Sequence, residues 1–306
     1  MRLFFFLGLY FFCCSKIFAQ INPADSTHQV IGYWDKNEKQ SYLITLQNYR
    51  VKGSDTTSRT MITYEVDVTI KDSTEQSYTI EWVYKNFNIK PENEFAKNLA
   101  ATSNNMKVVF KTDEMGAFRE VVNWKEIKDF MQKTTSDLKK QYKGAPNIEQ
   151  VISQTAKMYS DKSTIEAGAI QDIQQFYTWY GARYKLGEEL KGNVKVANLH
   201  GGAPFDAELT IVLDEVNFEE ENSILRMWQT TNSEQLTNAA FDQVKENAKK
   251  AGKKAPKKKD VPLLQNETRA ASRIHGPSGW IIYSIHTKEV WSGDNIAFEE
   301  RIIDLK

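Results

Sequence analysis

The stretch Thr60-Met-Ile-Thr-Tyr-Glu-Val-Asp-Val-Thr-Ile-Lys71 decides the fold class of this chain. Every second residue in it is apolar: Ile62, Tyr64, Val66, Val68 and Ile70. Apolar side chains at a spacing of two residues lie on one face of an extended chain. The stretch therefore predicts a long β-strand with one buried face.

The same alternation continues on both sides of this stretch. It includes Tyr42, Ile44 and Leu46 before it, and Tyr78, Ile80, Trp82 and Tyr84 after it. Turn-forming residues separate these runs at positions 53–55 and 72–74. Such short connections can join only antiparallel neighbours. We therefore predict antiparallel strands over residues 41–122.

The apolar spacing then changes to that of helices. Asn123 and Glu126 resemble a helix start, and Ser163 with Glu166 forms a second capping pattern. These patterns predict three helices over residues 123–184. Strand patterns return over 185–306, interrupted by a predicted helix at 233–250 and a lysine-rich loop at 249–260.

Strands, then helices, then strands are typical of an α+β protein. We predict a large, curved, mainly antiparallel β-sheet that resembles a half-barrel, with the central three-helix segment packed on one face. Because no Gly/Ser/Pro-rich linker divides the chain, residues 41–306 are predicted to form a single domain. Residues 20–40 carry few periodic apolar positions and are predicted to be a loosely ordered lead-in.

The N-terminus predicts export. Met1-Arg2 precedes an apolar run from Leu3 to Cys14, and Ala19 supplies a small residue for cleavage. We predict a signal peptide over 1–19 and a location in the periplasm or on the extracellular side of a Gram-negative envelope. The alternatives are an uncleaved membrane anchor and lipidation at Cys13 or Cys14. Both cysteines of the chain lie in this segment, so cleavage would leave a chain without thiols.

Charge and motifs exclude several classes of protein. Removal of the signal would leave 38 basic and 40 acidic residues, without the basic excess of nucleic-acid-binding proteins. No second apolar stretch is long enough for a transmembrane helix. The four histidines lack metal-binding spacing, and we predict no catalytic set, metal or cofactor. His200-Gly-Gly resembles part of an esterase oxyanion loop, but no nucleophile elbow accompanies it.

Two groups of side chains are candidate binding residues. Dense aromatic positions could line an apolar cavity under a curved sheet: Trp82, Tyr84, Trp124, Phe176, Tyr177 and Tyr180. Packing in a solid core is the alternative role for these residues. A lysine cluster could contact anionic surfaces: Lys253, Lys254, Lys257, Lys258 and Lys259. A solvated loop is the alternative for the lysines.

The order of elements resembles uncharacterised exported bacterial proteins with a curved antiparallel sheet. More distantly, it is similar to periplasmic lipoprotein carriers, in which an incomplete barrel closed by helices holds acyl chains. This resemblance implies an exported cell-envelope protein that binds a hydrophobic ligand, with a lipid or a lipidated protein as partner. The alternatives are a structural or interaction protein with a filled core and, third, a carboxylate-based hydrolase. We predict a protein that is not an enzyme.

Overall fold

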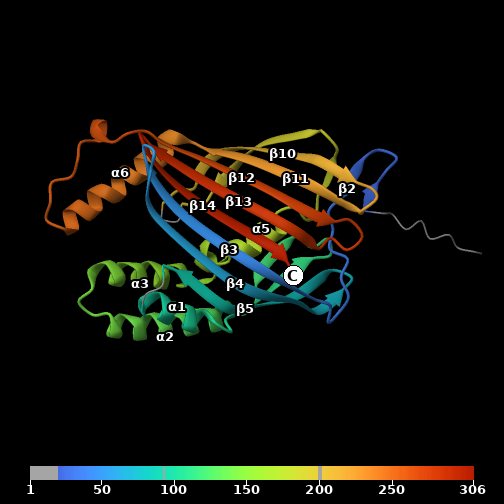
Figure 1. The fold of residues 1–306 in the computed structure, drawn as a ribbon, viewed down its shortest axis with the longest axis horizontal. Coiled ribbons are helices and arrows are strands. Elements are labelled where there is room, and N and C mark those ends of the chain that lie inside the picture. The colour runs from blue at the N-terminus through green and yellow to red at the C-terminus, as the bar shows by residue number, and fades with distance from the viewer. Residues whose placement is uncertain (1–19, 92–93, 199–201) are drawn as a thin grey trace, which may run out of the picture.

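A computed structural model of the protein describes residues 20–91, 94–198 and 202–306. The predicted signal peptide at 1–19 and His200 lie outside these residues. The fold is α+β, with a large antiparallel sheet that curls around a short central helix (Figure 1). The predicted fold class is therefore confirmed.

Eleven strands in the described residues form the large sheet, and every neighbouring pair is antiparallel. From one edge to the other, the order is β7 (Phe118–Val121), β6 (Lys107–Asp113), β5 (Ser77–Lys90), β4 (Asp55–Thr74), β3 (Lys39–Lys52), β14 (Asn295–Leu305), β13 (Ile281–Ser292), β12 (Leu264–His275), β11 (Asn222–Thr231), β10 (Phe205–Asn217) and β9 (Glu189–Val196). The sheet is open, because β7 and β9 do not pair with each other.

The long alternating stretch forms β4, as predicted. Its apolar residues pair across β5 with other large side chains, Val66 opposite Tyr84 and Val68 opposite Trp82. All four of these side chains are buried. They lie on the face of the sheet that the central helix, α5 (Gln171–Tyr177), covers. We call this face the inner face. The opposite, outer face has no helix packed over it in Figure 1.

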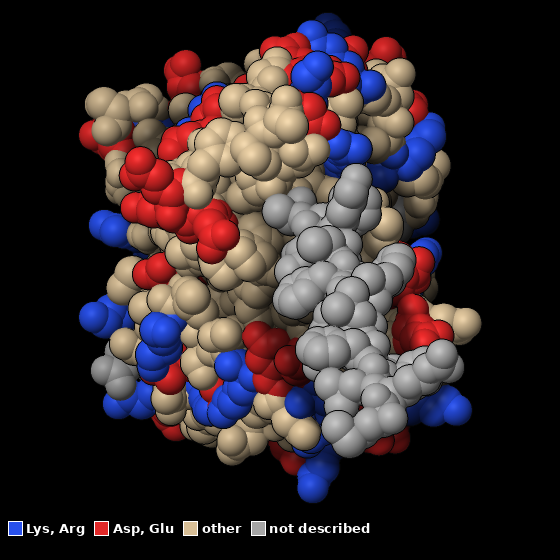
Figure 2. Space-filling model, turned by 90° about the vertical axis from the view of Figure 1, so that its right-hand side faces the viewer, with Lys and Arg blue, Asp and Glu red and all other residues tan. Residues whose placement is uncertain are grey.

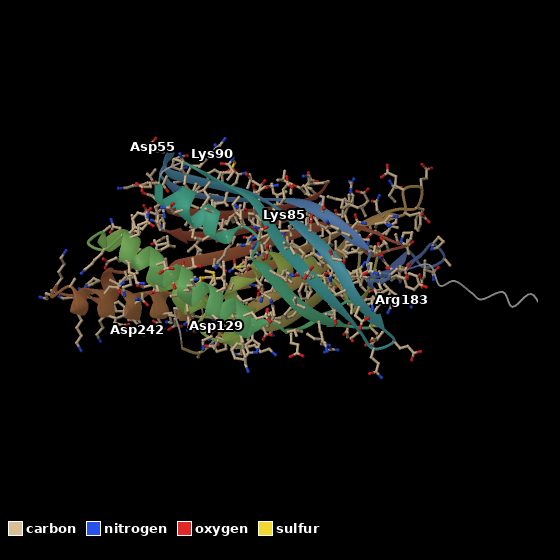
Figure 3. All side chains as sticks on the ribbon, turned by 90° about the horizontal axis from the view of Figure 1, so that it is seen from below. Asp55, Lys85, Lys90, Asp129, Arg183 and Asp242 are labelled. Atoms are coloured by element: carbon tan, nitrogen blue, oxygen red, sulfur yellow. The ribbon has the colours of Figure 1, made fainter. Side chains whose placement is uncertain are left out.

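The helices lie below the sheet and at one end of it (Figure 1). They are α1 (Glu94–Ser103), α2 (Trp124–Gln141), α3 (Pro146–Met158), α4 (Lys162–Thr164), the π-helix η1 (Ile165–Ala169), α5 (Gln171–Tyr177), α6 (Ser233–Lys250) and the 3-10 helix η2 (Lys258–Asp260). Seen from below, α2 with Asp129 and α6 with Asp242 lie away from the strand ends at Asp55 and Lys90 (Figure 3).

The third predicted helix starts differently from the expectation. The capping box joins Asp161 to Thr164, whose backbone N–H donates to the Asp161 carboxylate at 2.9 Å. It therefore begins two residues before Ser163. The helical segment is also divided into α4, the π-helix and α5. Asp and Ser are both common helix N-cap residues, so sequence spacing alone did not show that Asp161 and not Ser163 is the N-cap.

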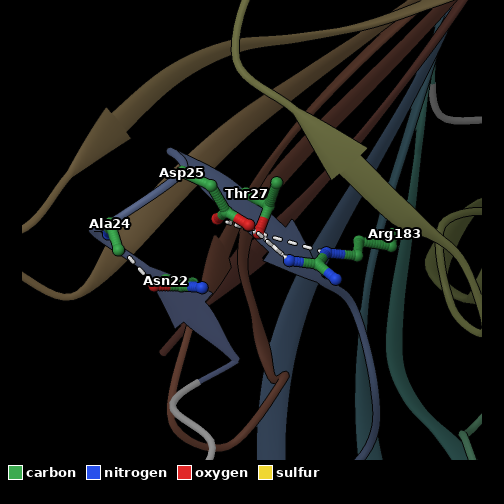
Figure 4. Close-up of polar contacts among 5 residues, drawn as sticks. All are labelled: Asn22, Ala24, Asp25, Thr27 and Arg183. Atoms are coloured by element: carbon green, nitrogen blue, oxygen red, sulfur yellow. Dashed lines mark hydrogen bonds and ion pairs between the residues drawn. The ribbon is translucent and has the colours of Figure 1, made fainter.

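Two further segments differ from the sequence predictions. Residues 94–103 form α1, inside the region predicted to contain only strands. Residues 20–40 are not a loose lead-in, because β1 (Ile21–Asn22) pairs with β2 (Thr27–Gln29), and β2 pairs with β8 (Arg183–Lys185), in a small second sheet. Figure 4 shows how this sheet is held together: Arg183 donates to Asp25 at 2.6 Å and to Thr27 at 2.9 Å. Trp34, which follows β2 in the sequence, is buried in the core.

Candidate functional site

The inner face of the sheet carries the candidate site, and α5 divides it into two parts. This helix packs on β13 and β14 near the middle of the sheet. Its side chains and those of residues 179–180 enter a buried aromatic cluster. We call the part of the inner face around α5 the closed half.

Five of the six aromatic residues predicted to line a cavity are buried together in the closed half: Trp82, Tyr84, Phe176, Tyr177 and Tyr180. The Phe176 ring is fully buried and lies 5.2 Å from the Tyr42 ring and 5.5 Å from the Trp82 ring, edge to face in both cases. Trp124 is half-buried against the same cluster. These rings pack on one another, and their role in lining a ligand cavity stays a prediction.

A buried carboxylate lies at the centre of the closed half. Asp172, in the first turn of α5, accepts hydrogen bonds from the Tyr64 hydroxyl at 3.2 Å and the Tyr84 hydroxyl at 3.0 Å. The backbone N–H of Ile173 donates to it at 2.9 Å. Burial raises the pKa of Asp172, while the charge of Arg301 and these hydrogen bonds oppose that rise. Burial also raises the pKa of both tyrosines well above the usual value.

Polar side chains of the sheet anchor the rest of α5. The Gln175 amide donates to the Ser284 hydroxyl at 2.9 Å, and the indole N–H of Trp179 donates to Ser272 at 2.7 Å. Ser272 in turn donates to Ser284 at 2.8 Å. Arg301 is buried and donates to Gln171 at 2.7 Å and Glu299 at 3.0 Å. These bonds fix the register of the helix on the sheet, because each buried polar group needs a partner.

A row of residues leads from Arg301 across the sheet, away from the aromatic cluster. Paired residues in adjacent strands point to the same face. The register therefore places these residues in one inner-face row: Ile211, Met227, Ala270, His286, Arg301, Leu46 and Ile62. The next row outward contains Leu209, Gln229, Thr268, Lys288, Glu299 and Asn48.

Several apolar side chains in these two rows are less covered than those around α5, whereas Met227, Ala270, Thr268 and Arg301 of the same rows are buried. Ile211, Leu209, Leu46 and Ile62 are only partly buried, and Lys288 is exposed. We call this part of the inner face the open half. The Nδ1 atom of His286 is buried there without a hydrogen-bond partner among the described residues. Burial, aided by the charges of Arg301 and Lys288, lowers the pKa of His286 to about 4.

Two hollows among the described residues lie away from the six aromatic residues. The larger, of about 450 Å³, lies between α6 and the start of β10 and is lined by Phe205, Gln235, Ala239 and Asp242 among others. The smaller, of about 140 Å³, includes Trp228, Arg269 and Ala271 of the outer face. Neither hollow was predicted from the sequence.

The predicted lysine cluster is exposed, as a surface-contact role would require. Lys253, Lys254, Lys257, Lys258 and Lys259 follow α6 at the end of the molecule farthest from the chain's described start (Figure 1). Figure 2 shows the opposite end, where acidic and basic side chains are interspersed. The contact of this cluster with anionic surfaces stays a prediction.

Sequence reasoning did not single out Asp172, Arg301 or His28. A weak signal existed for Asp172, which lies four residues before Phe176 on an otherwise apolar helix face. Arg301 likewise alternates with the buried Ile303. His28 is fully buried, with Nδ1 2.6 Å from the Ser223 hydroxyl, and burial lowers its pKa to about 4.

In 20–91, 94–198 and 202–306, no helix is long and apolar enough to cross a membrane. No group of three or more His, Cys, Asp or Glu side chains in the same ranges is placed to hold a metal ion.

No protein-family model and no curated protein matches this sequence. Among solved structures, the chain is similar to a lipovitellin described in terms of its lipid–protein interactions, with a TM-score of 0.42 and 9% sequence identity. The match covers 90% of this chain and 25% of the lipovitellin chain. At this level the likeness establishes neither a shared fold nor a shared function.

Proposed function

We propose that this protein is an exported, non-enzymatic binding protein that holds a lipid-like ligand on the open half of its inner face. One observation carries the proposal: the curved sheet presents partly exposed apolar side chains on its inner face beside a solidly packed aromatic cluster. Apolar surface that is concave and incompletely covered is a typical ligand site. Binding of an apolar chain would remove this surface from water, which favours association.

The residues of the open half suggest the class of ligand. Leu209, Ile211 and Leu46 offer apolar contact, whereas Lys288 is an exposed cation on the same face. No ion-pair partner for Lys288 is found among the described residues. An amphipathic molecule with an acyl chain and an anionic head group fits this combination, because each part finds a complementary surface.

Two helices carry further apolar side chains that the fold leaves uncovered. On α3, Val151 is 43% exposed and Met158 is 38% exposed, and on α6, Val244 is 45% exposed. Neither α3 nor α6 is an entirely polar surface helix, and α3 packs mainly on α2 and the π-helix. Both helices could therefore add apolar contact to a bound chain or to a lipidated partner.

A binding role also agrees with the chemistry of Asp172. Its two oxygens are hydrogen-bonded to Tyr64 and Tyr84, and it is the one fully buried acidic side chain among the described residues. Such bonding makes it an anchor for α5. We therefore favour binding over a carboxylate-based hydrolase, which requires two carboxyl groups acting on one bond.

The N-terminal segment supports the proposed location. A short basic start, an apolar run and a terminal small residue favour export to the periplasm or the cell exterior. N-terminal sequencing of the protein from its own host tests this part. We expect the mature chain to begin at Gln20, and a chain that retains Met1 would contradict export with cleavage.

The filled closed half favours a second candidate function. If the open half also stays empty, the protein would be a structural or interaction protein of the envelope, acting through its surface. The exposed cluster of five lysines would then be its contact with anionic partners.

Titration with a dansyl-labelled fatty acid separates the two candidates. Ile211→Asp places a charge on the inner face, whereas Val212→Asp places the same charge on the outer face of the same strand. We expect Ile211→Asp to weaken binding at least tenfold, since a buried unpaired charge costs more than about 1.4 kcal/mol. Val212→Asp is expected to bind like the parent.

Absence of binding by the parent chain would overturn the proposed ligand role, and equal loss in both variants would overturn the proposed site. Circular dichroism of both variants identifies any loss of binding that results from unfolding. If Ile211→Asp unfolds, Ile211→Ser with Val212→Ser repeats the comparison with a smaller perturbation.

A further inference from the structure

The two edges of the large sheet are treated differently by the fold. At one edge, β7 has four residues and α2 begins soon after it. The backbone N–H of Val121 in β7 donates to the Glu166 carboxylate at 2.7 Å, so this edge has a partner from the helical segment. An edge strand that is short and covered resists further pairing.

At the other edge, β9 is twice as long, and no described strand pairs with its free side. Its eight residues, Glu189–Val196, pair with β10. Residues 189–193 are all exposed. A Cβ added at Gly192 would meet no atom within 4 Å, which shows that space around the middle of the strand is open. An exposed edge of this length is a template for another strand.

The side chains of β9 follow a regular pattern on the two faces. Leu190 pairs with Ile211 and Val194 pairs with Ala207, so both lie on the inner face. Glu189 and Lys195 lie on the outer face with Lys191. The strand thus has an apolar face and a charged face, with an acid at its start and a base near its end.

We propose that β9 pairs with β9 of a second copy of this chain, in antiparallel orientation about a two-fold axis at Gly192. A two-fold axis perpendicular to the sheet keeps the inner faces of both copies on the same side. This register places Leu190 opposite Val194 on the inner face. It places Glu189 opposite Lys195 on the outer face, twice in each dimer.

The neighbouring registers are disfavoured by charge. An axis at residue 191 places Lys191 opposite its own copy, and an axis at residue 193 places Lys191 opposite Lys195. Like charges directly opposite each other destabilise a strand pair, and opposite charges stabilise it. A one-residue slip of one strand would also set apolar side chains against the charged face. The register at Gly192 therefore combines opposite charges with matched faces.

Both charges are already held near the edge within one chain. Glu189 forms an ion pair with Lys191 at 2.8 Å, and Lys195 forms an ion pair with Asp206 of β10. Each side chain can share its charge with a cross-strand neighbour, because carboxylate and ammonium groups accept or donate several bonds. The dimer would join two inner faces into one continuous surface and does not depend on a bound ligand.

Sedimentation velocity of the full mature protein over a range of concentrations tests the pairing. We expect a dimer in the parent, and we expect Lys195→Glu to raise the dissociation constant about tenfold or more, because two opposite-charge pairs become like-charge pairs. The charge swap Glu189→Lys with Lys195→Glu is expected to restore the parent value to within about threefold. Lys191→Gln, which faces Asn193, is the matched control and should leave association unchanged.

Hydrogen exchange supplies a readout that is independent of charge. The backbone amides of residues 189–196 that point away from β10 are expected to become more protected as the protein is concentrated, since pairing occupies the free edge. A protein that stays monomeric up to roughly 100 μM, above which specific association is weak, would overturn the proposal. A dimer whose dissociation constant is the same in Lys195→Glu as in the parent, or one whose β9 amides stay unprotected, would overturn it as well.

Discussion

Phe176→Ala is the perturbation that best distinguishes a filled closed half from a ligand cavity. The Phe176 side chain is 0% exposed and contacts aromatic rings of Tyr42 and Trp82 from the sheet. It also lies 4.9 Å from Tyr177. Truncation would leave a hole that these rigid neighbours cannot readily close.

The expected cost follows from burial and packing. Removing a fully buried Phe costs about 3–5 kcal/mol, as lost transfer free energy and a residual cavity. Aromatic pairs contribute roughly 0.5–1.5 kcal/mol beyond their area. We therefore expect a decrease of about 4–5 kcal/mol in the free energy of unfolding, near the upper end of the range.

Urea unfolding followed by tryptophan fluorescence measures this loss. Phe130→Ala, on α2 with 41% of its side chain exposed, is the matched control and should cost below about 1 kcal/mol. If Phe176→Ala cost no more than Phe130→Ala, the ring would not be part of a packed core. The closed half would then be an empty or ligand-filled cavity, contrary to the structure.

Three further predictions follow from buried groups and close contacts. His28 and His286 have pKa values lowered to about 4 from an ordinary 6.5, so only the unfolded state gains their protons as the pH falls below 6.5. Urea unfolding at pH 7 and pH 5 should therefore show a loss of about 2 kcal/mol per histidine, and His28→Asn should remove half of this pH dependence. Asp172→Ala leaves the hydroxyls of Tyr64 and Tyr84 without their acceptor and should cost about 2–4 kcal/mol by the same assay. Asp172→Asn keeps an acceptor without the buried charge and should cost about 1 kcal/mol or less; equal losses for the two variants would argue against these bonds. Gly279→Ala should lower the melting temperature markedly, because φ is +74° and a Cβ would overlap the Ile31 carbonyl. Gly293→Ala has a similar φ of +60° in open space, and a drop equal to that of Gly279→Ala would refute the steric argument.

The sequence predicted the fold well where the pattern was local. The alternation from Ile62 to Ile70 identified β4, because strand periodicity depends on neighbouring residues alone. The helix at 233–250 was predicted with the bounds that α6 has. By contrast, α1 and the small sheet of β1, β2 and β8 were missed. The pairing of β2 with β8 joins segments far apart in the sequence, which local patterns do not show. Trp34 is buried although the charged residues Asp35 and Lys36 follow it directly.

The candidate site was predictable only in part. Aromatic density pointed to the residues around Phe176, and the structure brings five of these six together. The sequence could not identify Asp172, because the chain has 40 acidic residues. The hydrogen bonds that hold this one buried carboxylate come from tyrosines 88 and 108 residues away. The open half is equally non-local. Ile211, His286 and Leu46 come to lie in one row only through the order of the strands.

The central claim is that the open half of the inner face holds a lipid-like ligand. Native mass spectrometry of the protein purified from its own host, without detergent, tests this claim most directly. We predict a mass above that of the polypeptide by one lipid, present in the parent and in Val212→Asp but lost in Ile211→Asp. A parent protein whose mass equals that of its polypeptide alone in repeated preparations would contradict the claim.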